Sequence, residues 1–219
     1  MTTQWNGVTT EGVLQEWETM VRHKLANSAK SYDWPAVLQI LDQYPSFINA
    51  WRLGGKSWYT PLHQAAHGGA PAEIAQELVE RGAWRTLPTA NGERPYDIAL
   101  RRGHHHLLPL LSPVYKHHVP LEILAKLQAN FHTVIRVRAE ALIAKYKLRL
   151  PELEPLLEIE EPIMLFTVPE MYGGFNYWLE ASGPNAKLIS HSWSRVVGGS
   201  GQYHMITSEG SQLMDKELL

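Results

Sequence analysis

Cysteine is absent from the 219-residue sequence, and this absence excludes three kinds of site. Without thiols the chain can form no disulfide bond, no thiolate zinc site and no cysteine nucleophile. A long apolar run is also missing, so no segment is expected to span a bilayer. Residues 1–18 lack the basic start and the apolar run of a signal peptide. Together these absences predict a soluble, cytoplasmic protein.

An excess of either charge is lacking as well. Twenty Lys and Arg stand against twenty-two Asp and Glu, which gives a formal net charge of -2. A nucleic acid is therefore not expected as the main partner. Apolar residues make up 44% of the chain, including eight Trp, so a sizeable core can be buried and disorder is not expected.

The strongest motif is the run Thr-Pro-Leu-His-Gln-Ala-Ala at residues 60–66. Its threonine suits a helix N-cap, and Pro61 suits the first helical turn, where no amide donor is needed. Gly69 permits the left-handed residue that ends a helix. Ile74 and Leu78 form the apolar stripe of a second helix, which only stacking against a neighbour can bury.

A second copy of this pattern follows 34 residues later, with Pro95, Ala99 and Gly103 in the places of the first copy's Pro, Ala and Gly. Arg94 and Asp97 replace the first copy's Thr and His. We therefore expect the polar network between Thr and His to be altered in the second copy.

A degenerate copy lies upstream at an offset of 37 residues, carried by Leu25 and Ala29. The larger offset implies a longer loop near residues 53–56. A helix over residues 12–24 is expected to cap the array.

The gap-free T-P-L-H-x-A match and its in-register second copy resemble the ankyrin-repeat family, as found in short bacterial ankyrin proteins. The alternative is a helical domain in which Pro and Ala recur by chance, which accounts poorly for two copies. The resemblance implies a cap helix and about three repeats within residues 1–113. It also implies that the chain binds another protein through its turn tips and the groove formed by the first helices.

Residues 114–150 are predicted to form one long amphipathic helix. Leu124, Leu127 and Phe131 begin an apolar series at helical spacing, and the helix is expected to run from about 121 to 147. We expect it to cover the open end of the repeat array.

The last part of the chain, residues 151–219, contains a linker and then short strand-like segments between Gly-rich turns. The expected strands are Ile163–Val168, Phe175–Glu180, Leu188–Val197 and Gln202–Thr207, with turns at 173–174, 182–185 and 198–201. The predicted fold class is therefore α+β: a short ankyrin-repeat α-solenoid with a long covering helix and a small C-terminal antiparallel β domain. A terminal turn or helix is expected after the last strand.

Candidate chemistry is sparse. His104, His105 and His106 suggest a metal site, but adjacent side chains on a helix point about 100° apart and cannot converge on one ion. The glycine loop at 198–201 matches neither a nucleophile elbow nor a phosphate loop. We therefore predict no metal site, no cofactor and no catalytic residues. The chain is interpreted as a protein other than an enzyme.

Exposed Trp and Arg side chains at repeat turn tips would be unusual on a bare surface, which makes them candidates for partner binding. They are Trp51, Arg52, Trp58, Tyr59, Trp84 and Arg85, with Lys56, Thr86 and Asn91 beside them. A possible second site in the β domain consists of Tyr172, Arg195, Gln202 and His204. Strand alternation would also put Arg195 on the same face as Trp193, so that it is buried if Trp193 is core.

The function predicted first is that of a protein–protein interaction module, an adaptor or an inhibitor, with a partner protein of unknown identity. A bacterial immunity or antitoxin role fits by analogy. Two alternatives stay open. One is a small-ligand binder or enzyme with its site in the β domain, which a deep pocket there would favour. The other is a structural subunit of a larger or homo-oligomeric assembly, which a broad apolar face on the long helix would favour.

Overall fold

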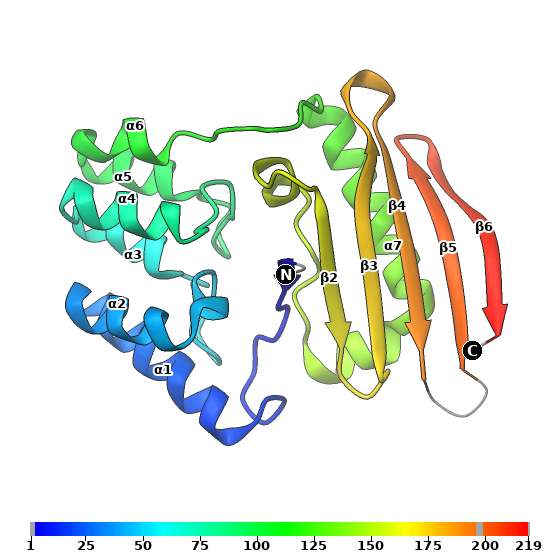
Figure 1. Cartoon of the computed structure of the whole chain (residues 1–219), viewed down its shortest axis with the longest axis horizontal. Coiled ribbons are helices and arrows are strands. Elements are labelled where there is room, and N and C mark those ends of the chain that lie inside the picture. Colours follow the sequence, from blue (N-terminus) through cyan, green and yellow to red (C-terminus); the bar gives the residue numbers. More distant parts are fainter. Residues whose placement is uncertain (1–2, 196–198, 219) are drawn as a thin grey trace. The chain divides into compact units, whose positions relative to one another are not determined.

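The computed structural model describes residues 3–195 and 199–218. The chain divides into two compact units (Figure 1). The helical unit comprises Thr9–Val114, and the sheet unit comprises Met1–Val8 together with Tyr115–Leu219. Within the described residues, none of the helices combines the length and the apolar character that crossing a membrane requires.

The helical unit contains three successive pairs of helical elements, of which α3 packs against both α1 and α5 (Figure 1). Their bounds are α1 Glu16–Lys30, α2 Trp34–Gln43, α3 Pro61–Gly68, α4 Ala72–Glu80, α5 Pro95–Arg102 and α6 Leu108–Leu111, with 3-10 turns at Pro45–Phe47 and His105–Leu107. Small side chains line the centre of the unit, because Ala65, Ala66 and Ala99 are fully buried and let neighbouring helices approach closely.

Local sequence explains where α3 begins and ends. Its first residue is Pro61, and the Thr60 hydroxyl lies 2.8 Å from Nδ1 of His63. The amide of Thr60 donates to the same nitrogen at 3.2 Å, and His63 Nε2 donates to the Leu87 carbonyl at 2.9 Å. Gly69 ends the helix with a φ of 64°, a left-handed conformation that glycine adopts without steric cost.

The start of α5 uses different chemistry, as expected from the altered motif. A carboxylate oxygen of Asp97 accepts a hydrogen bond from the Arg94 amide at 2.9 Å. Gly103 ends this helix with a φ of 77°. The two helices therefore share their Pro start and Gly end and differ in the side chain that caps the first turn.

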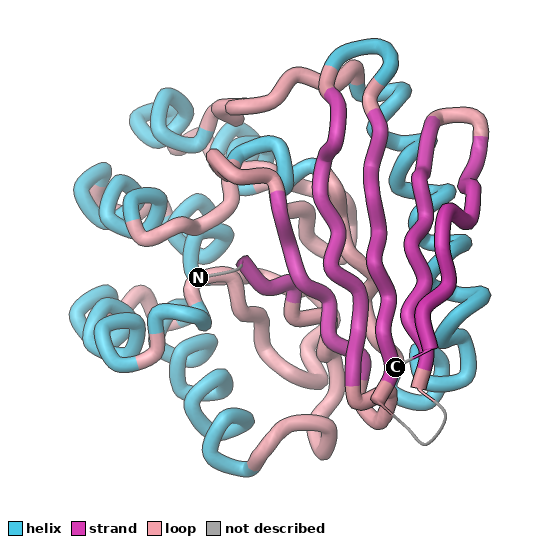
Figure 2. The backbone as a smooth tube through the Cα atoms, turned by 45° about the vertical axis from the view of Figure 1, so that its right-hand side comes forward, coloured by secondary structure: helices cyan, strands magenta, loops and turns pink. Residues whose placement is uncertain are grey.

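The sheet unit is built on one six-stranded sheet with strands in sequence order (Figure 2). The strands are β1 Thr3–Trp5, β2 Ile163–Val168, β3 Gly173–Ala181, β4 Lys187–Ser194, β5 Ser200–Thr207 and β6 Gly210–Leu218. β1 is parallel to β2, and each later strand is antiparallel to the one before it.

One long helix, α7 Leu121–Tyr146, packs on one face of this sheet. The Phe131 ring of α7 lies 4.9 Å from the Tyr177 ring of β3, measured between centroids. The helix is interrupted at Ala139, whose φ of -142° and ψ of 19° are not helical. Short 3-10 turns at Glu154–Glu158 and Gly183–Asn185 complete the unit.

The predicted fold class is wrong. The strands form a single mixed sheet and not a small C-terminal antiparallel domain, because Thr3–Trp5 adds a parallel strand from the other end of the chain. The helical unit has helices of 4 to 15 residues and does not form a clear repeat solenoid. The long helix, expected to cover the array, packs its apolar side chains against the sheet of its own unit.

Some of the predicted helices, strands and turns agree with the structure and others do not. The strand at Ile163–Val168 is confirmed, and the helix predicted over 121–147 ends at Tyr146. Gly173 and Gly174 begin β3 and do not form the expected turn. Beyond Ser194, where β4 ends, the predicted third strand reaches residues 196 and 197, and the predicted turn includes residue 198; these three lie outside the described residues.

Candidate functional site

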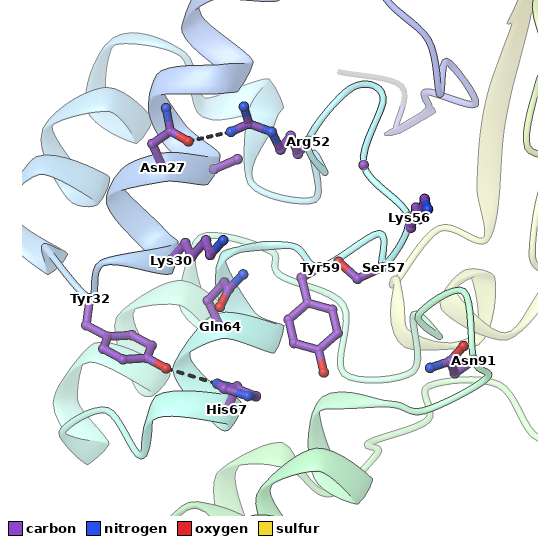
Figure 3. A pocket seen from close by; sticks show the side chains of 12 residues that line it. Asn27, Lys30, Tyr32, Arg52, Lys56, Ser57, Tyr59, Gln64, His67 and Asn91 are labelled. Atoms are coloured by element: carbon purple, nitrogen blue, oxygen red, sulfur yellow. Dashed lines mark hydrogen bonds between the residues drawn. The ribbon is translucent and has the colours of Figure 1, made fainter.

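A pocket of about 740 Å³ opens on the helical unit where α1, the loop before α3 and α3 itself meet (Figure 3). We call it the basic pocket. The side chains that give it its character are Asn27 and Lys30 of α1, Arg52, Lys56 and Tyr59 of the loop, and Gln64 and His67 of α3.

Positive charge gathers around this pocket. Lys30, Arg52 and Lys56 line it, and no Asp or Glu is among its described lining residues. Neither lysine has an ion pair within the part of the chain that the structure describes. Elsewhere on the unit arginines do have acidic partners: Arg81 lies 2.7 Å from Asp42. The pocket therefore concentrates cations whose charge is not compensated locally.

Tyr32 forms one wall of the pocket and is held there by its surroundings. Its backbone is left-handed, with a φ of 61°, a conformation that costs a non-glycine residue free energy. Its hydroxyl lies 2.9 Å from Nδ1 of His67 (Figure 3). The ring rests on Gly68, where an added methyl group would come within 2.3 Å of the ring carbon Cε1. The Tyr32 ring can therefore pack here only because residue 68 has no side chain.

The imidazole of His67, which lines the pocket, has a lowered pKa. Burial lowers the pKa of its imidazole, and the charges of Arg102 and Arg101 lower this pKa further. The His67 carbonyl accepts hydrogen bonds from Nε2 of His104 at 3.2 Å and from Nε of Arg102 at 3.4 Å. An anion in the pocket would reverse this effect and favour the protonated imidazole.

The loop before α3 holds Arg52 and Lys56 in place. Arg52 donates a hydrogen bond from Nη1 to the Asn27 side chain (Figure 3). Trp51 is buried beneath the loop, and its ring lies 6.4 Å from that of Trp58, whose backbone is left-handed with a φ of 57°. The Ser57 carbonyl accepts a hydrogen bond from the Ala90 amide at 3.0 Å. A buried aromatic anchor and this bond therefore fix the loop that presents the cations.

The structure brings only part of the predicted partner-binding set to the surface. Arg52 and Tyr59 line the basic pocket, together with Lys56 and Asn91.

The expected exposure of two tryptophans is wrong, because Trp51 is 2% exposed and Trp84 is 7% exposed. Their large apolar rings fill the interior beneath the turns. Trp58 and Arg85 are half-buried, and Nε of Arg85 donates to the Leu110 carbonyl at 2.8 Å. Thr86 is buried.

Sequence reasoning missed Lys30, Tyr32, Gln64 and His67 as pocket residues. For Gln64 and His67 the sequence did contain a signal. They lie three residues apart within the motif helix, on the side away from its buried alanines. Tyr32 carried no local signal, since its left-handed backbone and its contact with Gly68 exist only in the folded unit.

The four residues of the predicted second site do not lie together in the structure. Gln202 and His204 lie on the face of β5 that α7 covers. Tyr172 is 70% exposed, and Arg195 is exposed beyond the end of β4. Trp193 is only half-buried, so the condition under which Arg195 was expected to be buried is not met, and β4 ends at Ser194.

Two members of the histidine triplet, His104 and His106, form structural hydrogen bonds. Nε2 of His106 donates to the Ala70 carbonyl at 3.0 Å, and His104 bonds the His67 carbonyl as described. Among the residues that the structure describes, no group of three or more His, Asp or Glu side chains is arranged to hold a metal ion.

Comparison with known proteins adds no assignment: no protein-family model matches the chain, and no curated protein matches it.

Proposed function

We propose that the protein is an interaction module whose basic pocket binds an acidic segment of a partner protein. Such a module acts as an adaptor or an inhibitor by occupying its partner's surface. A cytoplasmic location, expected from the sequence, belongs to this proposal.

The observation that carries the proposal is the uncompensated charge of the pocket. Lys30, Arg52 and Lys56 face one concave surface on which no described acidic residue lies. Like charges held together repel, so an anionic ligand relieves this repulsion when it binds. Tyr32 and Tyr59 add rigid rings of the kind that carry binding energy at protein interfaces.

The size of the charged surface favours a protein over a nucleic acid. A nucleic acid needs a basic track along its backbone, and the chain as a whole carries a formal net charge of -2. A compact pocket with three cations, two tyrosines and several amides instead suits a short run of Asp and Glu side chains, whose carboxylates accept hydrogen bonds from Arg and Lys.

A charge-reversal experiment tests the proposal. The double variant Lys30→Glu with Lys56→Glu is compared with the double variant Lys24→Glu with Lys126→Glu, which has the same change in net charge at exposed sites outside the pocket. The probe is a fluorescently labelled peptide of alternating Glu and Gly, and its binding to the full-length chain is followed by anisotropy. Each exposed charge contact contributes about 0.5 kcal/mol, and a reversal loses this attraction and adds a repulsion of about the same size. Two reversals therefore cost about 2 kcal/mol and are expected to weaken binding about 30-fold.

Two outcomes would overturn the proposal. In the first, both double variants lose the same affinity, and net charge alone governs binding. In the second, a labelled DNA oligonucleotide of equal charge binds more tightly than the peptide, and the pocket recognises phosphate backbones. Added salt is expected to weaken peptide binding to the unmodified chain, because the contacts are solvent-exposed.

A further inference from the structure

The sheet unit contains a row of polar side chains where an apolar face is expected. Directly opposed residues of antiparallel strands lie on the same face of a sheet. Three successive pairs of β4 and β5 are polar in both members: Ser190 with His204, Ser192 with Gln202, and Ser194 with Ser200. We call these six residues the polar ladder.

The polar ladder faces α7. Ser190 is also paired with Tyr177 of β3, whose ring packs on Phe131 of the helix. At the other end, Nη2 of Arg138 donates to the carbonyl of Ser200 at 2.7 Å and to its hydroxyl at 2.6 Å. Helix and ladder therefore enclose a polar layer inside the sheet unit.

Several polar atoms of this layer have unmet hydrogen-bonding capacity. Ser190 is 0% exposed and Ser192 is 1% exposed. Neither hydroxyl has a hydrogen-bond partner among the described residues, and the same is true of Nδ1 of His204 and Nε of Arg138. Leaving a buried polar atom unpaired costs stability. Four such atoms in one layer therefore indicate that a bound ligand supplies their missing hydrogen bonds.

A cavity and an interrupted helix lie at the same place. A pocket of about 250 Å³ is lined by Arg138, Ser194 and Ser200, with Leu142 and Met171 on its apolar side. The non-helical residue of α7, Ala139, follows Arg138 directly. Unusual backbone conformations of this kind are frequent beside ligand sites. The volume lies below the range of about 300–1,000 Å³ that drug-sized ligands occupy, so the ligand is small.

The charge of the layer indicates the kind of ligand. Arg138 has no acidic partner among the described residues. Glu170 also lines the pocket, but its carboxylate is 2.6 Å from Nζ of Lys145. Burial and the charge of Arg138 lower the pKa of His204, so its imidazole is neutral at neutral pH. The layer therefore offers a guanidinium, serine hydroxyls and a neutral imidazole, which are mainly hydrogen-bond donors.

We infer that Arg138 and the polar ladder form a binding site for a small carboxylate, held by the guanidinium of Arg138 and the hydroxyl of Ser192. A planar carboxylate matches the planar fork of one arginine and carries the single negative charge that one unpaired cation balances. This site is separate from the basic pocket and from the partner-binding role proposed for it.

The test follows the His204 ring nitrogens by NMR while the full-length chain is titrated with sodium acetate or sodium propionate, using sodium chloride to hold the ionic strength constant. Saturable shifts with the carboxylates and none with chloride are expected. Arg138→Gln is expected to weaken binding at least tenfold, whereas Arg136→Gln, an exposed arginine two residues earlier that pairs with Glu140, is the matched control and leaves binding unchanged.

A second variant keeps the test decisive if Arg138→Gln fails to fold. Ser192→Ala removes an unmet hydroxyl, so the ligand-free variant is expected to have a higher unfolding temperature and about fivefold weaker carboxylate binding. The inference is overturned if no carboxylate gives saturable shifts at millimolar concentration, which would mean that the layer holds water only. It is also overturned if Ser192→Ala raises the unfolding temperature without changing carboxylate affinity, which would mean that the carboxylate binds away from the polar ladder. Tighter binding of inorganic phosphate than of any carboxylate would overturn the ligand class.

Discussion

Replacement of Gly68 by alanine tests whether the Tyr32 wall belongs to the binding site. The new methyl group would lie 2.3 Å from Cε1 of Tyr32, so the ring has to move. The movement is open to it, because Tyr32 is 41% exposed at the edge of the unit. The displaced ring loses its hydrogen bond to His67 and its packing, with rings 6.1 Å apart, against Trp34.

The change in the free energy of unfolding is small because two effects oppose each other. Loss of the hydrogen bond costs about 1 kcal/mol. Alanine in place of glycine within a helix returns about 0.5–1 kcal/mol. The net loss for Gly68→Ala is therefore expected to stay within about 1 kcal/mol. Binding responds differently, since Tyr32 and His67 both lose their positions, and the affinity for the acidic peptide is expected to fall about fivefold, equivalent to about 1 kcal/mol.

Urea denaturation and peptide anisotropy measure the two quantities on the same samples. The background Tyr32→Ala isolates the cause: without the ring, Gly68→Ala is expected to stabilise the chain by about 0.5–1 kcal/mol and to leave peptide affinity unchanged. The reasoning is refuted if Gly68→Ala destabilises the chain equally in both backgrounds. It is also refuted if the single variant binds the peptide as tightly as the unmodified chain.

Three further predictions concern buried groups. Burial lowers the pKa of His132, whose Nε2 donates to the Pro151 carbonyl at 2.8 Å. Its contribution to stability is therefore fully present above about pH 6.5, the pKa of the unfolded chain, and is lost as the pH falls from there through the lowered pKa of the folded chain, so His132→Gln should flatten the loss of stability below about pH 6.5 in thermal unfolding. Trp51→Ala should lower the free energy of unfolding by about 3–5 kcal/mol in chemical denaturation, because it empties a buried site. His63→Ala should cost about 3 kcal/mol by the same measurement, because it leaves the Leu87 carbonyl without its donor.

Each of these predictions has a clear contrary result. An unchanged pH profile for the His132 variant would show that its imidazole titrates alike in the folded and unfolded chain. A Trp51 variant with native stability but lost peptide binding would make that ring a contact residue and not an anchor. A stable His63 variant would mean that water replaces the imidazole at the Leu87 carbonyl.

The parts of the fold that sequence could predict are those governed by local rules. The Pro start and Gly end of α3 depend on Pro61 and Gly69 alone, so reading the motif located both. The start of α7 was predicted because Pro120 precedes a long apolar series. β1 could not be predicted, because three residues show no periodicity and the partner of Thr3, Met164, lies 161 residues later in the chain.

The residues of the candidate sites also separate into those that local sequence could identify and those that depend on long-range packing. Arg52 and Tyr59 were found because turn tips are recognisable, whereas Lys30 and Tyr32 join them only through the packing of α1 beside the loop. Trp51 was misplaced because sequence alone does not say which turn side chains point inward. The serines of β4 alternate as solvent-facing residues do, and only the position of α7 shows that Ser190 and Ser192 are buried.

The most direct test of the central claim is a charge-swap titration in the basic pocket. The affinity of the Lys30→Glu and Lys56→Glu double variant is measured for the acidic peptide and for a matched peptide in which Lys replaces every Glu. The account predicts that the double variant loses the acidic peptide and gains the basic one, while the unmodified chain shows the reverse preference. If the double variant rejects both peptides, or if it keeps the acidic one, charge complementarity in this pocket does not direct binding.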